Sequence, residues 1–197
     1  LKDEIQNKTR LSFKFENTEF DFELKNQNNK NLAFESLRKL FLNLKIDKQI
    51  KLLEMITGNN KRKNYSKACL TREEIKILDK HPLITIGSHS HNHLNFGILE
   101  REDLIYEIKK STEILENLLN HEVKHFSYPY GQNDQVSKRE SNAIRDLNFN
   151  TAVTTQASPI INSSPLLLPR IYVGKNTCAK TLINHLSGFY NLLNKIF

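Results

Sequence analysis

The stretch PLITIGSHSHNHLNF, residues 82–96, decides how the fold of this chain is interpreted. Its first part is a short apolar run between Pro82 and Gly87, and a run of this length between turn residues is typical of a buried strand. Its second part carries three imidazoles at alternate positions. They are His89, His91 and His93. A buried strand that ends in histidines indicates a loop with a chemical role.

The composition narrows the class of protein. The chain has 197 residues, of which 38% are hydrophobic and 26% charged, and the formal net charge is +7. Apolar residues recur along the whole chain, so we expect a globular protein with a core. The basic residues are dispersed, with the densest group in NKRKNYSK at 60–67, which favours a solvated basic surface over a polyanion-binding site. Cys69 and Cys178 form no CxxC motif and predict either one bridge or two buried thiols.

The sequence leaves the compartment open between cytoplasm and cell envelope. No apolar run approaches the length of a membrane span, and no signal peptide is visible. The chain starts at Leu1 rather than Met, so the natural N-terminus and any targeting segment can lie upstream.

The first third of the chain predicts a hairpin followed by two helices. Polar and apolar residues alternate over 11–24, which is typical of a β-hairpin. The polar run 26–31 indicates a break in regular structure. Two helices are predicted at 32–44 and 47–57, with Gly58 as the stop of the second.

From residue 71 onward the predicted order is helix, strand, helix, strand, helix, strand, strand, helix. This alternation indicates an α/β fold with a mainly parallel sheet or barrel. In such folds the functional loops follow the carboxyl ends of the strands. Both unusual loops, GSHSHNH and YPYG, are expected there, because each follows a predicted strand. These strands are at 83–87 and 123–129.

The histidine loop could bind a metal ion, because neutral imidazole is the commonest side-chain ligand for zinc. His89 and His93 share one face if the chain turns helically, whereas in an extended chain all three histidines project to one side. The spacing alone favours an ordinary surface loop. A zinc protease is a poor interpretation, because Ser90 stands where the first histidine would be followed by a catalytic glutamate.

The second loop adds aromatic rings beside a tight turn. In HFSYPYGQND, Pro129 restrains the bend and Gly131 permits a close approach of the backbone. The rings of Tyr128 and Tyr130 suit a sugar, whose apolar faces pack on aromatic side chains. Taken alone, the loop is better explained as a Pro-Gly turn with aromatics packed on the core.

Together the two loops resemble the polysaccharide deacetylase family, carbohydrate esterase family 4. The family motif H-[ST]-x-x-H matches residues 89–93, and residues 126–131 match the F-[AS]-Y-P-Y-G form of its third motif, which a common subgroup carries. Between them lies a long predicted helix with EIKKSTEILE, and LLLPRIYV is similar to the last strand of that subgroup. The resemblance covers about residues 71–175.

The resemblance implies a distorted (β/α) barrel that lacks its first strand and helix in this chain. On that interpretation the hairpin and helices of 11–57 are an insertion before the histidine strand. Residues 1–70 would form this N-terminal part and residues 71–197 the barrel portion of one overall domain.

The implied activity is metal-dependent hydrolysis of an amide, which removes acetyl groups from N-acetylated amino sugars. The substrate would be a polysaccharide or lipopolysaccharide precursor of the bacterial cell envelope, and the ion zinc, with cobalt and nickel as alternatives. By position, His89 and His93 would be metal ligands, Ser90 would brace their loop, and the backbone N–H of Tyr130 would stabilise the oxyanion. The residues implied to contact the glycan are Tyr128, Pro129 and Gly131.

Two departures from the family pattern stand out. The Asp-Asp motif that gives the family its base and its third metal ligand is absent, and the simplest explanation places it upstream. Ser127 occupies the position of the third motif's arginine, and Arg170 is a candidate replacement, with a surface salt bridge as the alternative. Asp134 and His91 are the remaining candidates for a third ligand.

Three functions therefore compete. The first is the deacetylase, and the second is an inactive relative that binds glycan without turnover. The third is a basic nucleic-acid-binding protein that uses the loop 61–67, but the chain shows no recognised nucleic-acid fold pattern, so no nucleic acid partner is expected.

Overall fold

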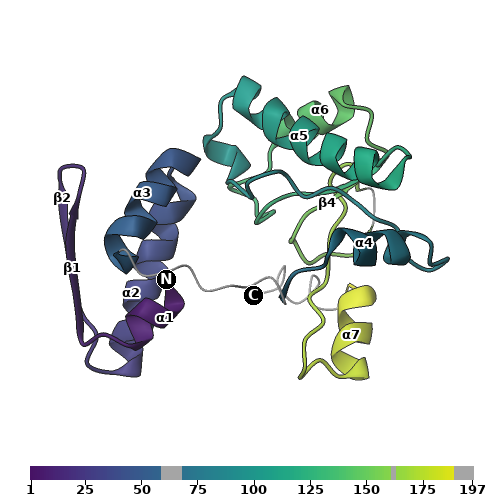
Figure 1. Cartoon of the computed structure of the whole chain (residues 1–197). Helices are drawn as coiled ribbons and strands as arrows, with labels where there is room; N and C mark the ends of the chain where they lie inside the picture. Colours follow the sequence, from purple (N-terminus) through teal and green to yellow (C-terminus); the bar gives the residue numbers. More distant parts are fainter. Residues whose placement is uncertain (59–67, 161–162, 189–197) are drawn as a thin grey trace. The chain divides into compact units, whose positions relative to one another are not determined.

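The computed structural model describes residues 1–58, 68–160 and 163–188 (Figure 1). The chain divides into two compact units, Leu1–Cys69 and Leu70–Phe197. The basic run 60–67, on which the nucleic-acid hypothesis depends, lies outside the described residues. Among the described residues, no helix is both long enough and apolar enough to cross a membrane.

The first unit is a hairpin with helices packed on it. Its elements are α1 (Lys2–Gln6), β1 (Arg10–Phe15), β2 (Thr18–Glu23), α2 (Gln27–Leu42) and α3 (Ile46–Thr57). The strands pair antiparallel, so the predicted hairpin is confirmed. The predicted break at 26–31 is wrong, because Asn26 caps α2 by accepting a hydrogen bond from the Asn29 N–H, and the polar run forms the first turns of the helix. Gly58 ends α3, as predicted.

One face of each element in this unit is buried in a shared core. Leu37 of α2 and Leu52 of α3 are both 0% exposed, and Phe15 of β1 packs in the same cluster. The opposite face of the hairpin is polar, with Arg10 paired to Asp21 across the strands. The unit therefore has a hydrophobic core of its own.

The second unit follows the predicted α/β order. Its elements are α4 (Arg72–Asp79), η2 (Phe96–Ile98), α5 (Arg101–Leu119), β3 (His125–Ser127), α6 (Lys138–Asp146), β4 (Thr151–Val153) and α7 (Ala179–Leu186). Strand β3 pairs in parallel with β4. Single parallel bridges add Ser88 beside Phe126 and Leu168 beside Val153. Four chain segments thus run side by side in one direction, which confirms the parallel α/β arrangement.

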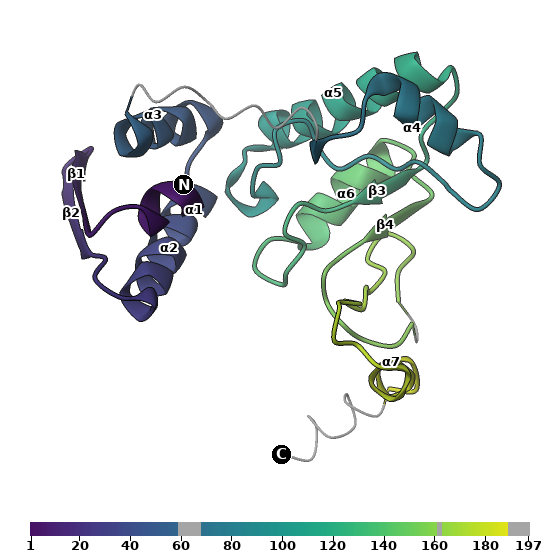
Figure 2. The same cartoon turned by 60° about the horizontal axis from the view of Figure 1, so that its bottom comes forward.

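Helices α5 and α6 pack against each other in this unit (Figures 1 and 2). Residues 126 and 152 are buried, and the Phe126 ring stacks on Phe96 and meets Phe149 edge to face. The alternate residues of the same strands, 125, 127, 151 and 153, line a cavity instead. Because side chains alternate along a strand, the sheet has one face packed in the core and one face open to this cavity.

The prediction of a buried strand at 83–87 is wrong. Only Ser88 exchanges backbone hydrogen bonds with β3, and Leu83 is 88% exposed. Among the described residues the segment pairs with a neighbour only at Ser88, and most of residues 83–87 are exposed, so no packed layer covers them. The cysteine prediction is wrong as well, because Cys69 and Cys178 are both free and exposed.

Candidate functional site

The histidine loop leaves the sheet at Ser88 and follows neither of the two conformations considered from the sequence. It is not helical and not extended, because Ser90 has φ +67° and His93 has φ +54°. Residues other than glycine rarely adopt this left-handed conformation, which costs on the order of 1–3 kcal/mol each and is concentrated at functional sites. The Ser90 hydroxyl accepts a hydrogen bond from the His93 N–H at 3.0 Å and so closes the turn between the two residues.

The strained loop brings two of the three histidines together. The ring centroids of His89 and His93 lie 4.8 Å apart, with the planes at 75°. The Tyr130 ring lies 4.7 Å from the His93 ring, also edge to face. The histidine loop and the YPYG loop therefore meet at the carboxyl ends of adjacent parallel segments.

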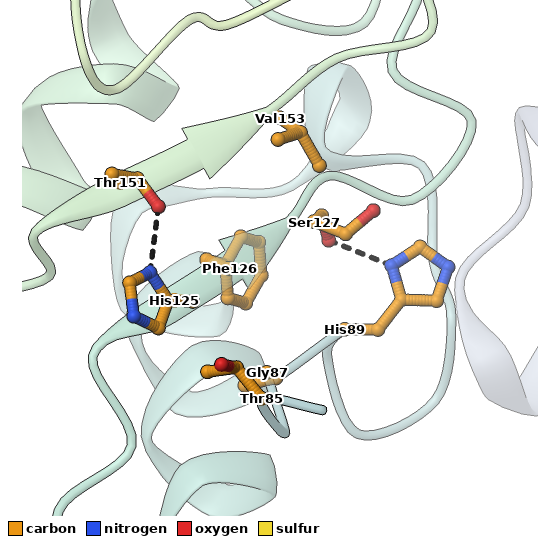
Figure 3. A pocket seen from close by; sticks show the side chains of 9 residues that line it. Thr85, Gly87, His89, His125, Phe126, Ser127, Thr151 and Val153 are labelled. Carbon is orange, nitrogen blue, oxygen red and sulfur yellow. Dashed lines mark hydrogen bonds between the residues drawn. The ribbon is translucent and has the colours of Figure 1, made fainter. Parts of the chain in front are cut away.

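The tautomer of His89 follows from its hydrogen bond. Its Nδ1 lies 2.7 Å from the backbone carbonyl oxygen of Ser127 (Figure 3). Because a carbonyl oxygen can only accept, Nδ1 carries the proton, and in the neutral ring Nε2 keeps its lone pair. This is the arrangement that metal-binding histidines usually show, with the second ring nitrogen donating to a carbonyl or a carboxylate.

The environment of His93 favours its neutral form. Partial burial lowers the pKa of His93, and the neighbouring charge of His89 lowers it further. A neutral imidazole is the form that binds a metal ion.

A divalent ion fits this pair only in part. Catalytic zinc sites use three protein ligands and leave one position for water. His89 and His93 are two imidazoles with ring centroids 4.8 Å apart, but the described residues hold no group of three His, Cys, Asp or Glu side chains placed to share one ion. His91 faces Tyr106 instead, with ring centroids 6.3 Å apart, and Asp134 lies exposed in its loop. Neither provides the third ligand that the sequence considered.

The two tyrosines of the YPYG loop point into different surroundings. Tyr128, which we expected to contact a glycan, is 0% exposed, and its hydroxyl donates to the Leu166 carbonyl at 2.9 Å. Pro129 is buried as well. Tyr130 instead has a left-handed backbone, with φ +59°, and places its ring against His93. Tyr128 and Pro129 offer no surface to a sugar, whereas Tyr130 does.

Gly131 is needed for two reasons at the same position. Its φ is +68°, and a Cβ placed there would lie 2.8 Å from the Thr155 backbone nitrogen. The Thr155 N–H donates to the Gly131 carbonyl, and its hydroxyl donates to the Tyr130 carbonyl at 2.6 Å. Arg170 binds the residue before Thr155, because its Nε donates a hydrogen bond to the Thr154 carbonyl at 2.6 Å.

A cavity of about 490 Å³ opens beside His89 on the uncovered face of the sheet (Figure 3). His125, which donates to or accepts from the Thr151 hydroxyl at 2.8 Å, lies at the opposite end from His89. The Ser127 hydroxyl is buried here and has no hydrogen-bond partner within the described part of the chain. It stands where the third motif carries arginine.

Glu107 was not among the site residues expected from the sequence. This residue of α5 is 2% exposed, and its carboxylate accepts three hydrogen bonds from residues 91–92. The sequence signal for a buried Glu107 was its position on the helix. It lies on the same buried face of α5 as Leu104, Ile108 and Ser111.

Comparison with known proteins identifies the family. The model of the polysaccharide deacetylase family matches residues 39–152, which is more than half of the chain. The chain belongs to the polysaccharide deacetylase family. The matched range begins within α2 and so extends further towards the N-terminus than the resemblance seen in the sequence. No curated protein matches the chain in sequence.

Solved structures of deacetylases share the fold. The Streptococcus pyogenes deacetylase PplD in complex with acetate is 22% identical, with a TM-score of 0.54, over 59% of this chain and 50% of that chain. A polysaccharide deacetylase from Bacillus cereus is 19% identical, with a TM-score of 0.51, over 60% of this chain and 37% of that chain. The chain thus spans half or less of the length of these deacetylases. The likeness confirms the α/β fold of the polysaccharide deacetylase type.

Proposed function

We propose that this chain carries the histidine side of the active site of a metal-dependent N-deacetylase. The substrate class is the N-acetylated amino sugar of a polysaccharide or lipopolysaccharide precursor in the bacterial cell envelope. One observation supports the proposal above the others: His89 and His93 converge beside Tyr130, with the Nε2 lone pair of His89 available. The F-[AS]-Y-P-Y-G subgroup is part of the same proposal.

In the proposed site, His89 and His93 hold a divalent ion, zinc or alternatively cobalt or nickel. When bound, such an ion lowers the pKa of a water molecule and polarises the acetyl carbonyl. The general base and the third ligand would be carboxylates, which family members supply from the Asp-Asp motif that this sequence does not contain. Ser90 braces the loop through the His93 N–H.

In the proposed site, the YPYG loop stabilises the oxyanion formed from the acetyl group and contacts the sugar. The Tyr130 backbone N–H is assigned to the oxyanion, since the left-handed residue stands beside the histidine pair. The Tyr130 ring makes the glycan contact that was expected from Tyr128 and Pro129. Gly131 keeps the bend close to Thr155, and Arg170 supports the bend through Thr154.

The test measures acetate release from N-acetylated oligosaccharides with added zinc, together with metal content. It uses this chain and a version extended by the natural upstream sequence. We expect release from the extended version, and we expect His89→Ala or His93→Ala to lower both release and metal content. His81→Ala, a change to an exposed histidine at the end of α4, is the matched control. A His89→Ala variant that keeps both metal and activity rejects the assignment.

The second candidate is a glycan-binding relative without turnover. It is favoured by one observation, the missing third ligand among the described residues. In this case the extended version binds the oligosaccharide, yet it retains no metal and releases no acetate.

A further inference from the structure

Helix α5 holds the histidine loop at two points on one of its faces. Glu107 and Ser111 are four residues apart in the helix and therefore face the same way. The Ser111 hydroxyl lies 2.7 Å from the hydroxyl of Ser88, where the loop leaves the sheet. Glu107 receives the loop again at residues 91–92. His89 lies between these two anchor points.

The Glu107 carboxylate accepts hydrogen bonds through both of its oxygens. Its Oε2 accepts from the backbone N–H of His91 at 3.1 Å and of Asn92 at 2.7 Å. Its Oε1 accepts from the Asn92 side-chain amide at 2.7 Å. A carboxylate that is 2% exposed needs such partners, because an unpaired buried charge is strongly destabilising.

These bonds fall between the two left-handed residues of the loop. Ser90 precedes residues 91–92 and His93 follows them, and both carry positive φ. A backbone in this conformation persists only where its surroundings fix it. Glu107 supplies fixed acceptors at that point, whereas the exposed side of the loop supplies none that reach residues 91–92 in the described structure.

We propose that Glu107 is a positioning residue of the deacetylase site. Its carboxylate holds the backbone at residues 91–92 and thereby sets the separation of the His89 and His93 rings. The inference rests on the proposed function for its chemical meaning. It assigns Glu107 no contact with the ion or the sugar.

Two substitutions separate this role from a general need for charge. In Glu107→Gln, the amide oxygen can still accept both backbone N–H groups, and its NH₂ can donate to Asn92 once that side-chain amide turns over. In Glu107→Leu, the size is similar but all three acceptor contacts are lost. A positioning role by hydrogen bonding therefore predicts that Gln replaces Glu and that Leu does not.

The experiment uses the full chain and two measurements, amide hydrogen exchange of residues 91–92 and zinc affinity by calorimetry. For Glu107→Leu we expect the loss of amide protection and a fall in zinc affinity of about tenfold or more. We expect Glu107→Gln to keep most of both. The control is Glu113→Leu, an exposed position on the same helix, which should change neither. Urea unfolding of each variant separates a local from a global effect.

Unchanged protection and affinity in Glu107→Leu would overturn the inference, and so would equal losses in the Gln and Leu variants. If the Leu variant does not fold, the Asn92→Ala variant tests the inference instead. It removes one of the three hydrogen bonds to Glu107, and Asn92 is exposed. We then expect a smaller loss in the same two measurements, and no loss overturns the inference. If neither the chain nor its upstream-extended version binds zinc, the proposed function is contradicted, whereas amide exchange still decides the role of Glu107.

Discussion

At the residue scale, the two tyrosines of the YPYG loop have different roles. Burial raises the pKa of Tyr128, so its hydroxyl stays protonated and remains a donor to the Leu166 carbonyl. Tyr130 is only partly buried and faces His93. The loop thus uses one ring to attach itself to the core and the other to border the site.

The Tyr128→Phe variant tests this division. We expect it to lower the free energy of unfolding by about 1 kcal/mol, because the Leu166 carbonyl loses a buried donor. Acetate release should stay unchanged, since no reacting group is touched. Urea unfolding and the release assay are the measurements, with Tyr172→Phe, at an 86% exposed position, as the control. A loss of activity without a loss of stability would return Tyr128 to the glycan site.

A second residue-scale prediction concerns Gly131→Ala. The added Cβ would lie 2.8 Å from the Thr155 backbone nitrogen, which is a clash, and the alanine would have to adopt φ +68°. We expect a loss of about 2 kcal/mol or more in unfolding free energy. Gly58→Ala is the comparison, because it has φ +63° and no atom within 4 Å of the new Cβ. Its cost comes from the backbone alone and should be about 1–3 kcal/mol, because ψ −162° places Gly58 in a region that is essentially restricted to glycine. The clash should make Gly131→Ala the costlier of the two variants.

Equal costs for the two glycine variants would contradict the clash at Gly131. Urea unfolding, followed by probes in each unit, provides both values.

At the scale of elements, the helices could be predicted because their signals are local. The helix predicted from residue 71 is α4, which begins with a capping box formed by Thr71 and Glu74 within four consecutive residues. The long helix predicted around EIKKSTEILE corresponds to α5. The strands depend on partners far away in the sequence, so the apolar run 83–87 could not reveal on which sides it would be paired.

The same reasoning explains which site residues the sequence could indicate. His89 and His93 are conspicuous because three imidazoles stand close together in the sequence. A glutamate on a helix looks the same in sequence whether it faces solvent or a loop, so Glu107 could be recognised only once residues 91–92 were placed beside it. The opposite surroundings of Tyr128 and Tyr130 likewise depend on the fold around them.

One interaction between elements predicts a pH dependence. His121, just after α5, has Nε2 2.8 Å from the Asp79 carboxylate of α4 and Nδ1 3.0 Å from the Glu122 carbonyl. The Glu122 carbonyl and Asp79 raise the pKa of His121, and the Glu116 charge adds to the effect. A doubly protonated ring donates to both oxygens, so the protonated form is the one that the fold stabilises.

The sign follows from the raised pKa. The stabilising contribution of His121 is complete below its ordinary pKa of about 6.5 and is lost as the pH rises through the higher value in the folded protein. We therefore expect the stability difference between wild type and His121→Gln to be larger at pH 6 than at pH 8. Urea midpoints of both proteins at the two pH values measure it. A difference that is constant or grows with pH contradicts the interaction.

At the scale of the whole molecule, the two compact units suggest separate cores with separate tasks. We propose that the N-terminal unit is a structural addition and that residues 71–197 form the deacetylase portion. The core of the first unit includes Leu52, which is 0% exposed, while the histidine site is built from the second unit alone. The family match nevertheless begins at residue 39, within the first unit.

The Leu52→Ala variant tests whether the units are independent. We expect a loss of about 2–5 kcal/mol in the stability of the first unit, because a buried leucine leaves a cavity. Amide protection at residues 91–92 should stay at the wild-type level. Hydrogen exchange measured across the chain reports both units in one experiment. A parallel loss of protection in both would show that they unfold as one.

The left-handed backbone shared by Ser90, His93 and Tyr130 has a consequence for protein engineers. Glycine or asparagine would relax each of these positions, so a selection for heat resistance alone would tend to accept them. Each exchange would also delete a group that the proposed site uses: a hydroxyl, an imidazole or an aromatic ring. Under the proposed function, thermal tolerance and turnover are therefore opposed at these three positions, and a screen should monitor both.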